Sequence, residues 1–323
     1  MLTNEAIPFD LSRIESIRIS GAGVEDRAKT LVARRTFKQE AQVAAYIRAI
    51  ECMDLTTLKG DDTRGRVERL CAKARDPVRR DIFSELGIGD LQLNTAAVCV
   101  YHDQVATALK ALRGCGVSVV AVSAGFPAGK ISFESKLHEI EASIQAGADE
   151  IDIVINRAFV LEGKWCALYD ELVMMREASS RRARLKTIIG CGDLGTLENI
   201  AKATACAIMA GTDFVKTSTG TESVNATLSY GLVMARQIRR FWQEQGIFAG
   251  FKAAGGIREA KNAMQWLILM KEELSDVDAR WLSKGGFRIG ASATQPGLLA
   301  DIEIQLEHLA FGNYSASHYH PIG

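Results

Sequence analysis

The chain alternates apolar runs of strand length with amphipathic segments of helix length, and it does so eight times. Such alternation with short connections favours a parallel sheet, because each parallel strand needs a crossover, usually helical, before the next. Eight strand-then-helix units are the number that closes into a (β/α)8 barrel. We therefore predict an α/β fold, a TIM barrel over residues 51–311. The predicted pairs are 53–58 with 63–86, 94–101 with 103–114, 117–123 with 133–146, 150–156 with 164–179, 185–190 with 197–210, 214–217 with 227–243, 248–253 with 259–274, and 287–291 with 298–311.

The competing fold is a doubly wound open sheet, but no glycine-rich GxGxxG turn follows the first predicted strand. Residues 1–50 precede the first unit. Between Glu25 and Ile50, apolar residues recur at helical spacing among charged ones, which predicts an N-terminal helical extension packed on the barrel. Residues 312–323 follow the last unit and are predicted to be a flexible C-terminal tail.

Composition narrows the function classes. Lys plus Arg and Asp plus Glu number 39 each, so the formal net charge is zero, and no bulk attraction to nucleic acid or an anionic membrane is expected. No apolar run approaches the ~20 residues that span a bilayer, and the first residues lack signal-peptide features. The seven cysteines include no CxxC pair, which fits free thiols in a reducing compartment. We expect a cytoplasmic protein with no metal and no cofactor.

Polar residues inside otherwise apolar strands carry the functional signal, because parallel strands covered on both faces are normally apolar throughout. Lys216 and Lys252 each stand near the end of a predicted strand. Side chains alternate along a strand, so Asp152, Val154 and Asn156 share the inward face of one strand, and Asp54 lies on one face with Thr56. We expect two lysines and at least one aspartate to converge at the mouth of the barrel, where such folds place their reacting groups.

A buried pair of lysines suggests amine chemistry. A free lysine with a pKa near 10.4 is only about one part in 2,500 deprotonated at pH 7. A second ammonium at ~4 Å, with an effective dielectric of ~20, lowers that pKa by roughly three units. We predict that Lys216 is the nucleophile, that Lys252 lowers its pKa, and that Asp152 handles the proton or water. The same spacing also fits a structural pairing of either lysine with Asp54 or Asp152.

Glycine-containing turns follow the sixth, seventh and eighth predicted strands. Barrels of this type often bind phosphate at this position through backbone N–H groups. Gly220, Gly255, Gly256 and the stretch from Gly290 to Ser292 are therefore candidates for an anion site, although glycines also occur in any tight turn.

Eight motifs stand in order along residues 50–311. They are Met53–Leu58 (MDLTTL), Asn94–Tyr101 (NTAAVCVY), Ala148–Asp152 (ADEID), Lys216–Gly220 (KTSTG), Val224–Thr227 (VNAT), Gly250–Lys252 (GFK), Gly255–Arg258 (GGIR) and Phe287–Ser292 (FRIGAS). Together they resemble the deoxyribose-phosphate aldolase family, in particular its longer, animal-type members. The resemblance implies a class I aldolase that cleaves 2-deoxy-D-ribose 5-phosphate to acetaldehyde and D-glyceraldehyde 3-phosphate.

The resemblance also implies residue roles. Lys216 becomes the Schiff-base lysine, Lys252 the pKa-lowering lysine and Asp152 a proton relay through water. Tyr319 resembles a tail tyrosine that assists proton transfer, although four residues follow it here. The implied partners are small aldehydes and deoxy-sugar phosphates, and the implied assembly is a homodimer. The substrate- or phosphate-binding residues implied are Asp54, Thr56, Cys99, Thr219, Gly220, Thr221, Gly255, Gly256, Arg258, Gly290 and Ser292.

The sequence departs from the family pattern around the expected phosphate. Thr221 stands where a lysine is usual, and the stretch 293–297 lengthens the loop after the eighth strand. Ala253 replaces a usual proline, and the stretch 190–193 (GCGD) changes the turn after the fifth strand. These changes suggest intact retro-aldol machinery with a relaxed or altered phosphate requirement. The alternatives are another Schiff-base barrel lyase acting on a modified or unphosphorylated sugar, and a sugar-phosphate-binding barrel without turnover.

Overall fold

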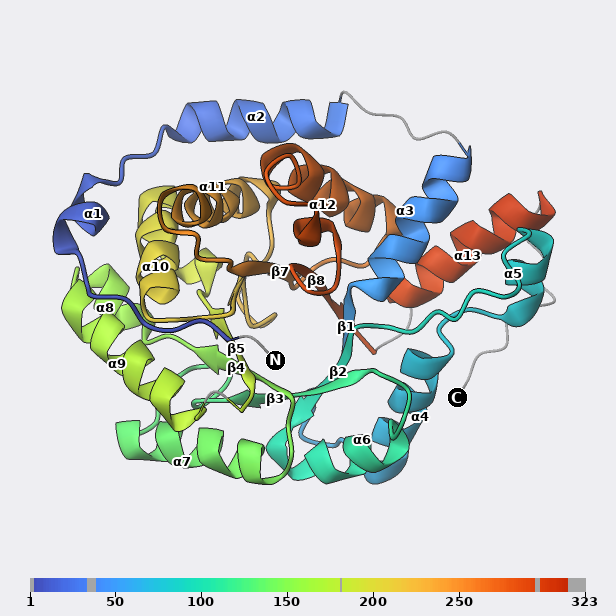
Figure 1. The fold of residues 1–323 in the computed structure, drawn as a ribbon, viewed down its shortest axis with the longest axis horizontal. Coiled ribbons are helices and arrows are strands. Elements are labelled where there is room, and N and C mark those ends of the chain that lie inside the picture. The colour runs from blue at the N-terminus through green and yellow to red at the C-terminus, as the bar shows by residue number, and fades with distance from the viewer. Residues whose placement is uncertain (1–2, 34–38, 181, 294–296, 313–323) are drawn as a thin grey trace.

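The computed structural model describes residues 3–33, 39–180, 182–293 and 297–312, and its centre is a closed barrel of eight parallel strands in sequence order (Figure 1). Every strand pairs in parallel with its two neighbours, and β1 closes the barrel against β8. The predicted TIM-barrel fold is therefore confirmed. The strands are β1 (Met53–Thr56), β2 (Ala97–Tyr101), β3 (Ser118–Ser123), β4 (Glu150–Val154), β5 (Arg184–Ile188), β6 (Phe214–Lys216), β7 (Gly250–Ala254) and β8 (Phe287–Ser292).

Helices surround the barrel and cover the outer face of the sheet (Figure 1). Short 3-10 helices are η1 (His102–Gln104), η2 (Cys191–Asp193) and η3 (Ala279–Leu282). The helices after the first strand are α4 (Arg64–Arg75), α5 (Arg80–Glu85), α6 (Val105–Ala111), α7 (Phe133–Gln145), α8 (Arg157–Leu161), α9 (Trp165–Ala178), α10 (Leu197–Met209), α11 (Leu228–Gln245), α12 (Ala260–Glu273) and α13 (Leu298–Phe311).

Local sequence determines the details of two predicted elements. The helical material predicted over 63–86 forms two helices, because Pro77 between them cannot continue a helical ladder. The predicted strand 150–156 ends at Val154. Asn156 does not extend the inward face of that strand, because its side chain accepts a hydrogen bond from the Ala158 amide and begins α8.

The N-terminal residues wrap around the outside of the barrel helices (Figure 1). Helices α1 (Leu11–Ser16), α2 (Gly21–Ala33) and α3 (Gln39–Glu51) precede the first strand, and α2 packs on α11 and α12. Before α1, Asn4 donates from its side chain to the carbonyls of Thr212 and Phe248, and its amide donates to Asp213. These bonds tie the N-terminal segment to the amino ends of β6 and β7.

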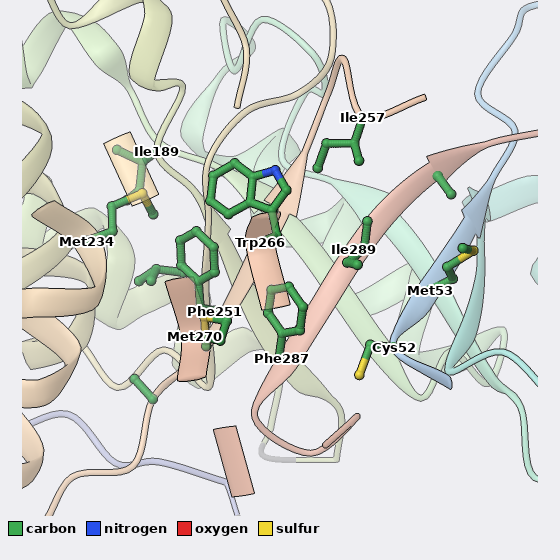
Figure 2. Close-up of a cluster of buried hydrophobic side chains, with 14 of the residues drawn as sticks. Cys52, Met53, Ile189, Met234, Phe251, Ile257, Trp266, Met270, Phe287 and Ile289 are labelled. Atoms are coloured by element: carbon green, nitrogen blue, oxygen red, sulfur yellow. The ribbon is translucent and has the colours of Figure 1, made fainter. Parts of the chain in front are cut away.

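The outward faces of β7 and β8 form part of the main hydrophobic core (Figure 2). Phe251 stacks on Phe287 with ring centroids 6.3 Å apart and lies 5.7 Å from the Trp266 ring of α12. Because side chains alternate along a strand, this packing turns Lys252 and Arg288 into the barrel. The core thus fixes the direction in which the charged residues point.

Inside the barrel, Phe214 of β6 lies directly against Gly250 of β7. The two residues are register partners, and a Cβ atom at position 250 would lie 2.3 Å from the Phe214 ring. Glycine is therefore the residue that leaves room for this ring beneath the lysines. None of the helices that the structure describes is both long and apolar enough to cross a membrane.

Candidate active site

Two lysine nitrogens meet on one carboxylate oxygen inside the barrel. The Nζ atom of Lys216 lies 2.8 Å from Oδ2 of Asp152, and the Nζ atom of Lys252 lies 2.9 Å from the same oxygen. Lys252 also donates to Oδ2 of Asp54 at 2.6 Å. Since both nitrogens are less than 3 Å from one atom, they are within about 6 Å of each other, close enough for strong electrostatic coupling.

These four side chains come from four strands and are shielded from water. Lys216 and Lys252 are register partners on the adjacent strands β6 and β7, whereas Asp54 and Asp152 reach in from β1 and β4. Lys216 is 4% exposed and Lys252 1%, and both aspartates are fully buried. The structure therefore brings together the groups that the alternation of side chains predicts at the barrel mouth.

Three further charged side chains, which the sequence analysis missed, lie in the same interior. Lys186 of β5 binds Asp152 at 2.9 Å and Glu150 at 2.7 Å. Arg288 of β8 binds Asp54 and Glu150, each at 2.7 Å. Glu150 stands two residues before Asp152, and Lys186 and Arg288 also interrupt apolar strands, so the signal that revealed the other residues was present for these as well.

The surroundings of the two lysines shift their pKa values in opposite directions. Burial lowers the pKa of Lys216, and the ammonium of Lys252 lowers it further, while Asp152 acts in the raising direction without reversing the shift. Burial also disfavours the charged form of Lys252, but two carboxylates, Asp152 and Asp54, outweigh it and raise the pKa of Lys252 above its usual value. The result is one amine that deprotonates more readily than usual beside one that stays an ammonium ion.

The aspartates remain ionised in this setting. Burial opposes the charge of Asp152, but the ammonium groups of Lys186, Lys216 and Lys252 outweigh it and hold its pKa well below the usual value. Burial is likewise outweighed at Asp54, mainly by Lys252 and then by Arg288, so that pKa is lowered too. Lowered lysine pKa values at such sites suit imine formation, in which the free amine is the nucleophile.

Apolar and weakly polar groups lie close to Lys216. The ring centroid of Phe126 lies 5.8 Å from the Lys216 nitrogen, and Tyr101 meets that ring edge-on at 6.3 Å. Cys99 is fully buried, and burial raises its thiol pKa to about 11, so it is a neutral thiol at physiological pH. Thr56 is half-buried beside it in register, and its hydroxyl donates to the carbonyl of Asp54.

The loop after β6 binds an anion supplied by the chain itself. The carboxylate of Glu222 accepts from the amide of Thr219 at 3.0 and 3.1 Å, from its hydroxyl at 2.8 Å, and from the amide of Gly220 at 3.0 Å. The hydroxyl of the exposed Thr221 lies 2.9 Å from that of Thr219. The sequence analysis treated this loop as a phosphate cradle and missed Glu222, which occupies its donors in the structure.

The other predicted anion-site residues lie at the carboxyl ends of β7 and β8. Gly255 and Gly256 have φ values of +90° and +79°, and a Cβ atom on Gly255 would lie 2.6 Å from Asn225. Arg258 is exposed just beyond them, and Gly290 and Ser292 belong to the last half of β8. Tyr319 and residues 294–296 lie outside the described residues.

The unusual stretch 190–193 packs against the β6 loop. Gly190 has a φ of +68°, and a Cβ atom at Gly192 would lie 2.0 Å from the carbonyl oxygen of Val224. Arg157 bridges the two segments, because it lies 3.2 Å from a carboxylate oxygen of Asp193 and 3.8 Å from one of Glu222. This departure from the family pattern therefore fits the position of the Glu222 loop.

A closed (β/α)8 barrel with a buried, readily deprotonated lysine at its mouth defines the class of barrel enzymes that can form an imine with a carbonyl substrate. Comparison with known families identifies one family for this chain. The DeoC/LacD family aldolase domain matches residues 48–271, and the chain belongs to that family.

Individual relatives are similar to this chain over almost its whole length. The deoxyribose-phosphate aldolase of Homo sapiens is 49% identical over 321 residues, covering 99% of this chain and 98% of the human protein. The Mus musculus deoxyribose-phosphate aldolase is also 49% identical, over 97% of each chain. A crystal structure of a candidate deoxyribose-phosphate aldolase from Toxoplasma gondii supports the fold, with a TM-score of 0.67 and 18% identity over 88% of this chain and all of that one.

Replacing Lys252 by methionine tests the coupling of the two lysines. The variant loses the ammonium that lowers the pKa of Lys216 and leaves two carboxylates with less positive charge beside them. The acidic limb of kcat/KM should therefore move to higher pH, by about one unit or more. A pH profile measured beside Lys271→Met, an exposed lysine on α12, checks this. An unchanged profile with full activity would contradict the coupling.

Proposed function

We propose that the protein is a class I aldolase that reversibly cleaves 2-deoxy-D-ribose 5-phosphate to acetaldehyde and D-glyceraldehyde 3-phosphate through a Schiff base on Lys216. The observation that carries the proposal is the shared Asp152 oxygen between Lys216 and Lys252, in a chain of the DeoC/LacD aldolase family. The 49% identity to deoxyribose-phosphate aldolases over nearly the full chain supports the substrate.

The first half of the reaction forms the imine. The neutral amine of Lys216 adds to the C1 aldehyde carbon of the open-chain sugar, and the carbinolamine formed loses its hydroxyl as water after gaining a proton. Lys252 is the positioned ammonium that can supply a proton, and Asp152, which contacts both nitrogens, relays protons between these groups through water. The iminium that results is the electron sink for bond cleavage.

The second half cleaves the C2–C3 bond and releases the two products. Loss of the proton from the C3 hydroxyl turns C3 into the aldehyde carbon of glyceraldehyde 3-phosphate, and the electron pair of the C2–C3 bond moves into the iminium to give an enamine. A proton added to C2 regenerates an iminium, and water hydrolyses it to acetaldehyde and free Lys216. We retain Tyr319 as the proposed donor to C2, on the family resemblance alone.

The phosphate end of the substrate carries a second proposal, a relaxed or altered phosphate requirement. Thr221 supplies no positive charge, and Glu222 places a buried carboxylate on the amides of Thr219 and Gly220. A charge-assisted hydrogen bond is worth roughly 1.5–3 kcal/mol, so the missing cation alone weakens phosphate binding about tenfold to a hundredfold. The glycines after β7 and β8, with Arg258 and Ser292, are then the proposed phosphate contacts.

The family resemblance also supports two further proposals, about the assembly of the protein and its location in the cell. We propose a homodimer, whose solution mass would be twice the 35.1 kDa of the chain. We propose a cytoplasmic location, on the free cysteines of the sequence and on the same resemblance.

Borohydride trapping with acetaldehyde tests the proposed reaction. The wild-type protein should gain one reduced two-carbon adduct, located on Lys216 by peptide mass spectrometry, because only a neutral buried amine forms the imine efficiently at neutral pH. Lys216→Leu should abolish the adduct and reduce cleavage of the sugar phosphate by at least about a thousandfold. A wild-type protein that gains no adduct would be a binding barrel without turnover.

Comparing kcat/KM for 2-deoxyribose 5-phosphate and 2-deoxyribose tests the altered phosphate requirement. We expect a modest preference for the phosphate, and Thr221→Lys should raise that preference about tenfold to a hundredfold by restoring a cation near the loop. Thr221→Met is the matched uncharged control. A wild-type preference of many thousandfold for the phosphate would remove this second proposal and leave the first intact.

A further inference from the structure

Six of the seven charged groups described above inside the barrel form a closed ring of alternating sign. Going round it, Asp152 contacts Lys252 at 2.9 Å, Lys252 contacts Asp54 at 2.6 Å, and Asp54 contacts Arg288 at 2.7 Å. Arg288 then contacts Glu150 at 2.7 Å. Glu150 contacts Lys186 at 2.7 Å, and Lys186 returns to Asp152 at 2.9 Å. Every member is 1% exposed or less.

The ring is formally neutral, because its three carboxylates match two ammonium groups and one guanidinium. Lys216 is attached to it from outside, through an oxygen of Asp152 that Lys252 already occupies. Within the described part of the chain, Lys216 has no carboxylate contact that is not shared in this way. A seventh, positive charge in this buried interior is therefore the one that electroneutrality disfavours.

Arg288 holds the ring together across the barrel. Its guanidinium places one nitrogen on Asp54 of β1 and the other on Glu150 of β4, two strands that are not neighbours. A planar fork with five donors can do this, whereas the single nitrogen of a lysine cannot do so as rigidly. The Phe214 ring lies 5.6 Å from the same guanidinium and supports it from below.

We propose that Arg288 and Glu150 are positioning residues that set the charge state of Lys216 in opposite directions, Arg288 favouring the free amine and Glu150 the ammonium ion, as members of a ring that is neutral without Lys216. Neither residue contacts the reacting nitrogen, so their effect passes through Asp152 and Asp54. The inference deepens the proposed aldolase function and rests on it. Loss of a ring cation should favour the ammonium form of Lys216, and loss of a ring anion should favour its free amine.

Among the residues that the structure describes, few other charged or titratable groups face these ones. Lys216 faces Asp152, Lys252 and the neutral thiol of Cys99. Glu150 also meets Arg184 of β5 at 3.3 Å. The side chain of Arg184 is 26% exposed, so solvent screens its charge and we leave it outside the ring. It provides a matched control, since it touches the same carboxylate from the rim.

The experiment measures how the rate of borohydride-trapped adduct formation on Lys216 with acetaldehyde depends on pH. In Arg288→Met the midpoint should move to higher pH by about one unit, and in Glu150→Gln it should move to lower pH by a similar amount. This is the effect of a unit charge roughly 10 Å away at an effective dielectric of ~20. Arg288→Lys, which keeps the charge but has a single nitrogen, should move the midpoint less than Arg288→Met, and Arg184→Met should leave it in place.

The paired variants separate electrostatic positioning from simple structural damage. Damage would lower the rate in both variants without moving the midpoints in opposite directions, and thermal melting shows which variants fold. Glu150→Gln keeps nearly the same shape, so it tests the inference even if Arg288→Met does not fold. Midpoints that stay fixed, or that move the same way, would overturn the inference while leaving the adduct and the proposed function standing. Absence of the adduct in the wild-type protein would overturn both.

Discussion

One carboxylate oxygen, Oδ2 of Asp152, is shared by two buried lysine nitrogens, and the rest of the site depends on how that sharing is resolved. Two ammonium ions this close repel each other strongly in a poorly solvated interior. Lys252 has a second carboxylate, Asp54, and keeps its proton. Lys216 shares its only described carboxylate partner, so it is the nitrogen that gives up its proton most readily.

The barrel offsets the free-energy cost of burying these charges. Removing so many charges from water is costly, and such burial is tolerated only where the charges pair closely. The strands bring complementary charges together from opposite sides of the interior, and the aromatic core outside β7 and β8 fixes which residues point inward (Figure 2). The fold thus supplies both the pairing and the direction.

The sequence predicts a large part of this structure, because its strongest signals are periodic. Eight strand-then-helix units leave few architectures open, and alternation along the strands places Lys216, Lys252, Asp152 and Asp54 on inward faces. The same alternation applies to Glu150, Lys186 and Arg288. Their partners could not be assigned, since the contacts join strands that are distant in the sequence and depend on the exact register and side-chain length.

Loops were harder to predict, for a different physical reason. The loop after β6 contains glycine and hydroxyl residues in a pattern that suits phosphate, but a carboxylate three residues from Thr219 reaches the same amides. The contact of Glu222 could not be predicted from the residue types in the loop, because it depends on the path of a short turn. Pro77 is the opposite case, since its effect on the helix after β1 is local and could have been read from the sequence.

The charge state of Lys216 is the centre of this account, and nuclear magnetic resonance titration of the wild-type protein, with lysine side chains isotopically labelled and Lys216→Leu used for assignment, measures it most directly. We expect the Lys216 nitrogen to titrate below the usual lysine value of 10.5, while Lys252 remains protonated throughout the same pH range. A Lys216 nitrogen that titrates at or above its usual value would contradict the account, because the pair of lysines would then be two ordinary ammonium ions in a structural network.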